Sequence, residues 1–211
     1  MIHEMRTYEI VPGKIAEYLE ITAEHGRPAR ADTFGRLEGH FVAESGILDR
    51  IVTIWSYDDF AARAERRREL AKNERWTREF LPRIDPLILA KHTSVLNPMR
   101  PLASPSFETA LYELRQDRAR PGKAKAYVEA LSPLVDRVAQ LGHNVALWTT
   151  EVGDIDEIVH LWAFPTTDAW MTARRTWDES PALDSLRARR AEWIVEARST
   201  LLRADRLSPM R

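Results

Sequence analysis

Apolar and polar residues alternate from residue 2 to residue 10, and this period of two predicts a β-strand that opens the chain. The Pro12-Gly13 pair predicts a turn into a helix. A single buried helical face then follows at the i, i+3, i+4, i+7 spacing, formed by Ile15, Tyr18, Leu19 and Thr22. We expect this helix to end near Gly26 and Pro28, because glycine and proline commonly stop helices.

A hairpin is the next expected element. Residues 39–45 and 51–57 are β-prone, and residues 46–50 between them have the length and composition of a hairpin connection. Asp58 and Asp59 follow, where either carboxylate can cap the start of a helix.

A short helix around Trp76 and Phe80 and a strand over residues 87–96 complete the first pattern. The same order of elements returns from Phe107 onward, with Ser180-Pro181 expected at the start of its last helix. Each half therefore reads as strand, helix, two strands, helix and strand.

The repeat is visible in the sequence itself, because three short motifs recur in the same order roughly 110 residues later. The pairs are Pro12-Gly13-Lys14 with Pro121-Gly122-Lys123, residues 44–46 with 151–153, and residues 96–100 with 207–211. We therefore predict two modules over residues 1–100 and 107–211, joined by a proline-stiffened linker at residues 101–106.

The βαββαβ order of each module is the ferredoxin-like arrangement, which belongs to the α+β class. Its helices cover one face of the sheet and leave the other face in need of cover. We therefore expect two tandem ferredoxin-like modules that form an intramolecular α+β barrel, a pseudo-dimer within one chain.

Both modules resemble the NIPSNAP family of the dimeric α+β barrel superfamily. The first module carries the closer resemblance, in residues 4–8, 12–14, 17–19, 55–58 and the arginine-rich helix before Trp76 and Phe80. The second module keeps Tyr112-Glu113-Leu114-Arg115 and residues 159–164, but has Gln116-Asp117 where the first has Thr7-Tyr8. A site that depends on the Tyr8 ring therefore has no matching aromatic residue in the second module.

What the resemblance implies about the fold is specific, whereas what it implies about activity is broad. Proteins of this superfamily include cofactor-free monooxygenases, isomerases, polyketide cyclases, heme-binding enzymes and stress-response proteins. Fold analogy therefore assigns no reaction.

Charge and composition exclude several classes of function. The formal net charge is −1, from 31 basic and 32 acidic residues, so no electrostatic footprint for nucleic acid is present. The absence of cysteine excludes disulfides and thiolate chemistry. No secretory signal pattern and no apolar run of about 20 residues is found, so we expect a cytoplasmic protein with no membrane partner.

Glu4 and Arg6 share one face of the first strand, and Glu113 and Arg115 repeat the arrangement. In a closed interior, a carboxylate could act as general base while arginine stabilises developing negative charge. The alternative is that these residues neutralise one another without any role in chemistry.

His160 and Trp162 share a strand face in the second module, where the first module has Thr53 and Trp55. Imidazole titrates near neutrality, so His160 is a candidate for proton transfer. A satisfied core histidine is the competing interpretation, and both tryptophans can equally be packing residues.

The candidate catalytic residues are thus Glu4, Arg6 and His160, and the candidate substrate-binding residues are Tyr8, His40, Trp55, Glu113, Arg115 and Trp162. The histidines form no recognisable metal motif, so we predict no cofactor, with heme or a metal site assembled across strands left as alternatives. The arginine runs at residues 63–68 and 187–190 are expected to be solvated helix faces.

Three hypotheses of function follow. The first is an enzyme that oxygenates, isomerises or cyclises a small hydrophobic or aromatic molecule inside the barrel. The second is a non-catalytic ligand-binding or scaffold protein. The third is a homo-oligomer that associates through apolar helix faces bearing Trp76, Trp170 and Trp177.

Overall fold

The computed structural model describes residues 1–109, 111–138 and 141–210, which group into two compact units. The first unit contains Met1–Val95 together with a C-terminal segment that begins at Ala204, and the second contains Leu96–Arg203. The two units are groups of residues that pack closely together, whereas the predicted modules are defined by the sequence repeat. The compact units therefore do not test the module boundaries, which stay a prediction. Arg211, the last residue of the third repeat motif, lies outside the described residues.

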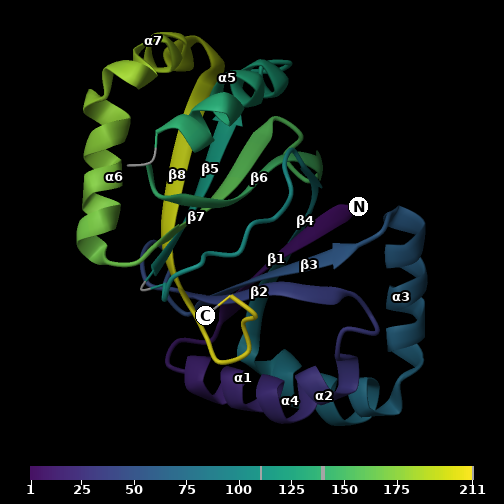
Figure 1. Ribbon diagram of the computed structural model, residues 1–211. Helices are drawn as coiled ribbons and strands as arrows, with labels where there is room; N and C mark the ends of the chain where they lie inside the picture. The colour runs from purple at the N-terminus through teal and green to yellow at the C-terminus, as the bar shows by residue number, and fades with distance from the viewer. Residues whose placement is uncertain (110, 139–140, 211) are drawn as a thin grey trace. The chain divides into compact units, whose positions relative to one another are not determined.

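The first unit has a four-stranded antiparallel sheet with its helices on one face (Figure 1). Its strands lie in the order β4-β1-β3-β2. The elements are β1 (Ile2–Ile10), α1 (Ile15–Ile21), η1 (Thr22–Gly26), α2 (Arg27–Arg30), β2 (Arg36–Ala43), β3 (Arg50–Tyr57), α3 (Phe60–Lys72), η2 (Arg75–Phe80), α4 (Leu81–Ile84), η3 (Asp85–Leu87) and β4 (Ile88–Pro98).

The second unit repeats this order with the strand sequence β8-β5-β7-β6. Its elements are β5 (Leu111–Ala119), α5 (Ala124–Arg137), β6 (His143–Val152), β7 (Glu157–Phe164), α6 (Thr167–Glu179), η5 (Pro181–Leu183), α7 (Asp184–Trp193) and β8 (Ile194–Ala204). The predicted ferredoxin-like order is therefore confirmed in both halves of the chain.

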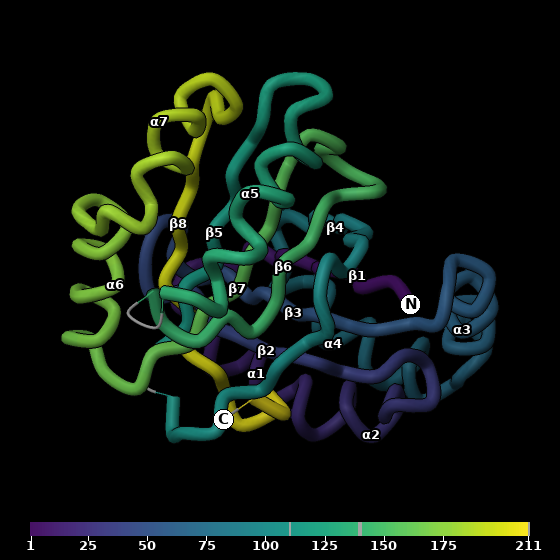
Figure 2. Tube along the Cα trace, turned by 45° about the horizontal axis from the view of Figure 1, so that its top comes forward, coloured from purple at the N-terminus to yellow at the C-terminus, as the bar shows by residue number. Residues whose placement is uncertain are grey.

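The C-terminal segment, drawn in yellow, returns to the elements of the first unit near β2 and α1 (Figure 1 and Figure 2). The backbone N–H of Asp205 donates to the carbonyl of His40 at 3.2 Å, and the N–H of His40 donates to Ser208 Oγ at 3.2 Å. These bonds fix the segment along β2.

The end of the first helical region was predicted wrongly. A π-helical turn at Thr22–Gly26 continues α1, and Pro28 occupies the first turn of α2, which runs to Arg30. Proline is tolerated there because its missing N–H would have no intrahelical partner in a first turn. The extension places Arg30 beside the sheet.

The helix starts were predicted well, although their capping differs in detail. Asp59 accepts a hydrogen bond from the backbone N–H of Ala62 at 2.8 Å, which is an N-cap contact at the start of α3. Ser180 precedes Pro181 at the start of η5, as predicted, but its side chain makes no cap hydrogen bond.

Each unit buries its own core between the sheet and the helices. The core of the first unit includes Ile10, Tyr18, Ile51 and Phe80, and the larger core of the second is formed around Trp162. In the described part of the chain, no helix is long and apolar enough to cross a membrane.

Candidate functional site

A cavity of about 290 Å³ lies between the sheet and the helices of the first unit. This volume is near the lower limit of ordinary small-molecule pockets. Its aromatic walls are Tyr8, Tyr18, Trp55, Trp76 and Phe80, and its cationic side chains are Arg6, Arg27, Arg30, Arg67 and Lys91. His40 and Thr53 complete the strand side of the cavity.

Glu4 is fully buried and binds two arginines. Its carboxylate accepts hydrogen bonds from the Nε atoms of Arg6 and Arg63. Burial alone would raise the pKa of Glu4, but these two guanidiniums lower it below its usual value. Glu4 therefore stays ionised and holds Arg6 at the wall of the cavity.

Arg6 also donates from Nη1 to the hydroxyl of Tyr8 at 3.3 Å. Burial opposes its charge, yet Tyr8 and Glu4 together raise the pKa of Arg6 above its usual value. Arg6 is a permanent cation at the cavity wall.

The expected orientation of this strand face is corrected by the structure. Arg6 and Tyr8 face the helices of their own unit, because the cavity that they line is closed by residues of η1, α2, η2 and α4. A period of two shows which side chains share a strand face, but not whether that face meets the helices.

Arg30 is a cavity residue that sequence reasoning missed. It is 3% exposed, and its Nη2 donates to Tyr57 Oη at 2.7 Å and to the carbonyl of Phe34 at 3.2 Å. Its guanidinium carbon lies 3.3 Å from the centroid of the Trp55 ring, a close cation–π contact. Its Nε has no hydrogen-bond partner, and burial lowers the pKa of Arg30 to about 10. The only sequence signal near it was the Pro28 that was expected to end the helix.

The expectation that both arginine runs are solvated is wrong in part. Arg66 and Arg68 are exposed, but Arg63 binds Glu4 and the half-buried Arg67 lines the cavity. Residues 63 and 67 lie on one helix face because they are four apart. The second run behaves similarly, since Arg190 reaches a buried carboxylate.

A histidine–aspartate pair lies on the β2 side of the cavity. His40 Nδ1 is 3.1 Å from Asp205 Oδ2, and each residue is less than 5% exposed. Asp205 Oδ1 accepts the backbone N–H of Leu207 at 2.9 Å, which fixes the carboxylate. Asp205 was not predicted, because it follows the last strand and no local pattern links it to His40.

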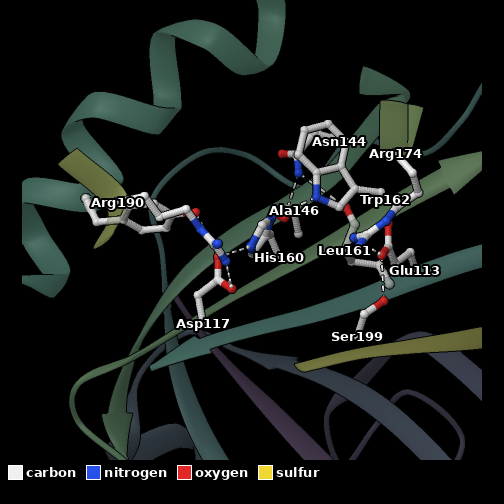
Figure 3. A network of polar contacts seen from close by, with 11 residues as sticks. Glu113, Asp117, Asn144, Ala146, His160, Leu161, Trp162, Arg174, Arg190 and Ser199 are labelled. Atoms are coloured by element: carbon white, nitrogen blue, oxygen red, sulfur yellow. Dashed lines mark hydrogen bonds and ion pairs between the residues drawn. The ribbon is translucent and has the colours of Figure 1, made fainter. Parts of the chain in front are cut away.

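In the second unit, His160 is fully buried and lies in a polar network (Figure 3). Its Nε2 is 3.3 Å from Asp117 Oδ2, and its Nδ1 accepts from Trp162 Nε1 at 2.8 Å. Asp117 also accepts from Tyr127 Oη at 2.8 Å and from Arg190 Nη2 at 3.1 Å. Both imidazole nitrogens are thus engaged with protein groups.

Two further predicted residues lie beside this network. Glu113 accepts from Ser199 Oγ at 2.5 Å and from Arg174 Nη1 at 3.4 Å. The guanidinium of Arg115 stacks on the ring of Trp177 at 4.6 Å, and that ring also meets Trp162 edge-on at 6.2 Å.

Strand register shows which residues of the two units correspond. In the first unit, Thr53 of β3 pairs with Arg6 of β1 and with His40 of β2. In the second unit, His160 of β7 pairs with Arg115 of β5 and with Leu147 of β6. Thr53 therefore corresponds to His160, and His40 to Leu147. Tyr8 corresponds to Asp117, two residues after each arginine. The second unit therefore fills with its own side chains the region that remains a cavity in the first.

The prediction that no cofactor is needed stays a prediction. Across residues 1–109, 111–138 and 141–210, no group of three or more histidine and carboxylate side chains is placed to hold a metal ion.

Comparisons with known proteins place the chain in one family and support its fold. The sequence profile of the NIPSNAP family matches residues 3–102 and again residues 112–209. Human protein NipSnap homolog 3A is 28% identical over 217 residues, which cover 100% of this chain and 86% of the human protein. Mouse protein NipSnap homolog 3B is 27% identical, with coverage of 99% and 85%.

Among solved structures, a candidate monooxygenase from Fusobacterium nucleatum subsp. nucleatum matches with a TM-score of 0.70 at 12% identity. The match covers 96% of this chain and 91% of that protein. This likeness concerns the fold alone. With the repeated family match, it confirms the predicted class, an α+β barrel fold built from two tandem ferredoxin-like modules.

Proposed function

We propose that this chain, which belongs to the NIPSNAP family, binds a small and largely apolar molecule in the cavity of its first unit and removes a proton from it. The observation that carries the proposal is the presence of the buried His40–Asp205 pair and several arginines around one aromatic cavity.

His40 is the proposed base. With Nδ1 beside the Asp205 carboxylate, Nε2 is the nitrogen left to accept a proton from a bound molecule. His40 Nδ1 and Asp205 Oδ2 are within ion-pair distance but form no hydrogen bond, so the proposed role of the carboxylate is to stabilise the imidazolium that forms. His160 is less suited to this role, since it is fully buried with both nitrogens engaged.

The arginines are the proposed electrophilic groups. When a C–H bond next to a carbonyl loses its proton to His40, the electron pair moves onto the carbonyl oxygen and forms an enolate. Arg6 lines the same cavity and stays charged, so it can stabilise that oxygen. Glu4 acts as a positioning residue, because its carboxylate is occupied by Arg6 and Arg63.

An enolate can be reprotonated at another carbon, attack a second carbonyl within the same molecule, or react with molecular oxygen. These outcomes correspond to isomerisation, cyclisation and oxygenation. The likeness to a candidate monooxygenase supports the third outcome only at the level of fold. Proton abstraction is the step shared by all three, so it is the step proposed.

Deuterium exchange tests this step without knowledge of the natural product. The protein is incubated in D₂O with a panel of aryl ketones, whose α-protons exchange slowly in neutral water, and loss of the α-proton is followed by NMR. We expect catalysed exchange that falls about 100-fold or more in His40→Gln, as for loss of a general base. Asp205→Asn should lower the rate by a smaller factor.

The exposed His92 supplies a matched control, and His92→Gln should leave the exchange rate unchanged. Loss of exchange in His160→Gln with retention in His40→Gln would assign the base to the second unit and contradict the proposal. Saturable binding without exchange would instead identify the cavity as a non-catalytic ligand site.

A further inference from the structure

We infer that the ligand of the first-unit cavity is a flat aromatic anion, whose negative group occupies the place that the Asp117 carboxylate occupies in the second unit. This inference rests on the proposed cavity site and names the class of molecule that it takes.

The cavity wall of the first unit is rich in positive charge. Lys91 is paired with Asp85 at 2.6 Å, Arg27 with Asp32 at 3.3 Å, and Arg6 with Glu4. In the part of the chain that the structure describes, neither Arg30 nor Arg67 has a carboxylate within ion-pair distance. Two cations at the wall, Arg30 and Arg67, therefore form no ion pair with a protein carboxylate, although Glu4 raises the pKa of Arg67 from a longer distance.

Each of these two guanidiniums has a buried nitrogen that lacks a hydrogen bond. Arg30 Nε and Arg67 Nη1 are buried atoms without a hydrogen-bond partner. Burial lowers the pKa of both residues, and the charge of Arg6 lowers both further. Unpaired buried donors and mutually repelling cations are costly, and an anion bound among them would relieve both costs.

In the second unit, a protein carboxylate stands at the corresponding strand position and is bound by an arginine of α7. Asp117 stands at the position of Tyr8 and accepts hydrogen bonds from Arg190 and Tyr127, the counterpart of Tyr18. The first unit has a tyrosine at this position and so lacks the corresponding carboxylate. A ligand carboxylate or phenolate is the group that would restore the pairing.

The aromatic walls indicate the shape of the rest of the ligand. Trp76 and Phe80 form a ring pair with centroids 4.6 Å apart, and Tyr8 and Tyr18 form another at 6.3 Å. Rings of this kind favour stacked or edge-on contact with a planar aromatic molecule. The volume of about 290 Å³ suits a molecule of one or two fused rings.

Calorimetric titration of the full-length protein with 2-naphthoate and with the uncharged 2-naphthamide separates charge from shape. We expect naphthoate to bind at least 10-fold more tightly than naphthamide. Arg30→Gln should weaken naphthoate at least 10-fold and change naphthamide less than 2-fold. Arg66→Gln, on the exposed face of the same unit, should leave both affinities unchanged.

A second pair of variants tests the correspondence with Asp117 directly. Tyr8→Asp introduces the carboxylate of the second unit and should reduce naphthoate binding at least 10-fold more than Tyr8→Asn, which has nearly the same shape without the charge. Equal effects of the two variants would overturn the inference. If Tyr8→Asp fails to fold, the comparison of naphthoate with naphthamide still decides.

The outcomes also separate this inference from the proposed function. Equal affinity of the wild-type protein for the acid and the amide overturns the anion inference and leaves the cavity proposal standing. If inorganic phosphate binds as tightly as 2-naphthoate, the naphthalene ring adds no affinity, and the inference that the ligand is aromatic is overturned. Binding of neither aromatic probe contradicts both.

Discussion

The protonation state of the buried His160 is set by its burial and by the residues that it contacts. Burial lowers the pKa of His160 below its usual 6.5, and the neighbouring Asp117 opposes that shift without overcoming it. His160 is thus neutral in the folded protein near neutral pH, with Nδ1 as the acceptor for the Trp162 N–H.

This state predicts a pH dependence of stability. Because the folded pKa of His160 is depressed, the unfolded chain binds a proton first as the pH falls. The contribution of neutral His160 to the free energy of unfolding is therefore complete above about pH 6.5 and is lost progressively as the pH falls below that value. We expect the free energy of unfolding, measured by urea denaturation, to fall between pH 7.5 and pH 5.

In His160→Gln this decline should be smaller, while the exposed His92→Gln should show the wild-type decline. Glu4 and Asp117 also have lowered pKa values, but their contributions are lost only below about pH 4.5, outside this window. An identical slope in wild type and His160→Gln would contradict the account of the network. His3, whose pKa is also lowered by burial, accounts for any slope that remains.

At the scale of single residues, the sequence indicated which residues share a strand face, but not which side chains contact one another in the folded protein. Tyr8, His40 and Trp55 were predicted as binding residues, and all three line one cavity, although their role in binding stays a prediction. Arg30 and Asp205 could not be predicted, because the first depends on a helix that continues through Pro28 and the second on the return of the C-terminal segment.

At the scale of elements, hydrophobic periodicity and capping chemistry predicted most of the strands and helix starts. The strand predicted over residues 2–10 has those bounds in the structure, and the predicted cap at Asp59 is formed. Periodicity did not reveal the π-helical turns at Thr22–Gly26 and Arg75–Phe80, since these depend on how the helices pack around the cavity.

The N-cap of α3 provides a quantitative test at this scale. Asp59→Ala removes the acceptor for the Ala62 N–H, and it should lower the free energy of unfolding by about 1 kcal/mol. Urea denaturation at neutral pH measures this change. The neighbouring exposed Asp58→Ala should change stability by less than about 0.5 kcal/mol, and an equal loss in both variants would refute the capping assignment.

At the scale of the whole molecule, the sequence repeat predicted a duplicated fold, and the structure shows that the two units carry different side chains at corresponding strand positions. The first unit keeps a cavity with unpaired arginines, whereas the second supplies Asp117 and His160 to the equivalent region. The repeat predicts two similar modules, but only side-chain packing shows which of them keeps a cavity at this position, between Arg6 and Tyr8 and the helices.

A crystal structure of the protein with bound 2-naphthoate would show directly whether the first-unit cavity holds an aromatic anion. We expect one molecule per chain, with its rings among Trp55, Trp76 and Phe80 and its carboxylate within hydrogen-bond distance of Arg30 or Arg67. Naphthoate in the second unit, at the surface only, or with its carboxylate directed away from both arginines would contradict the account.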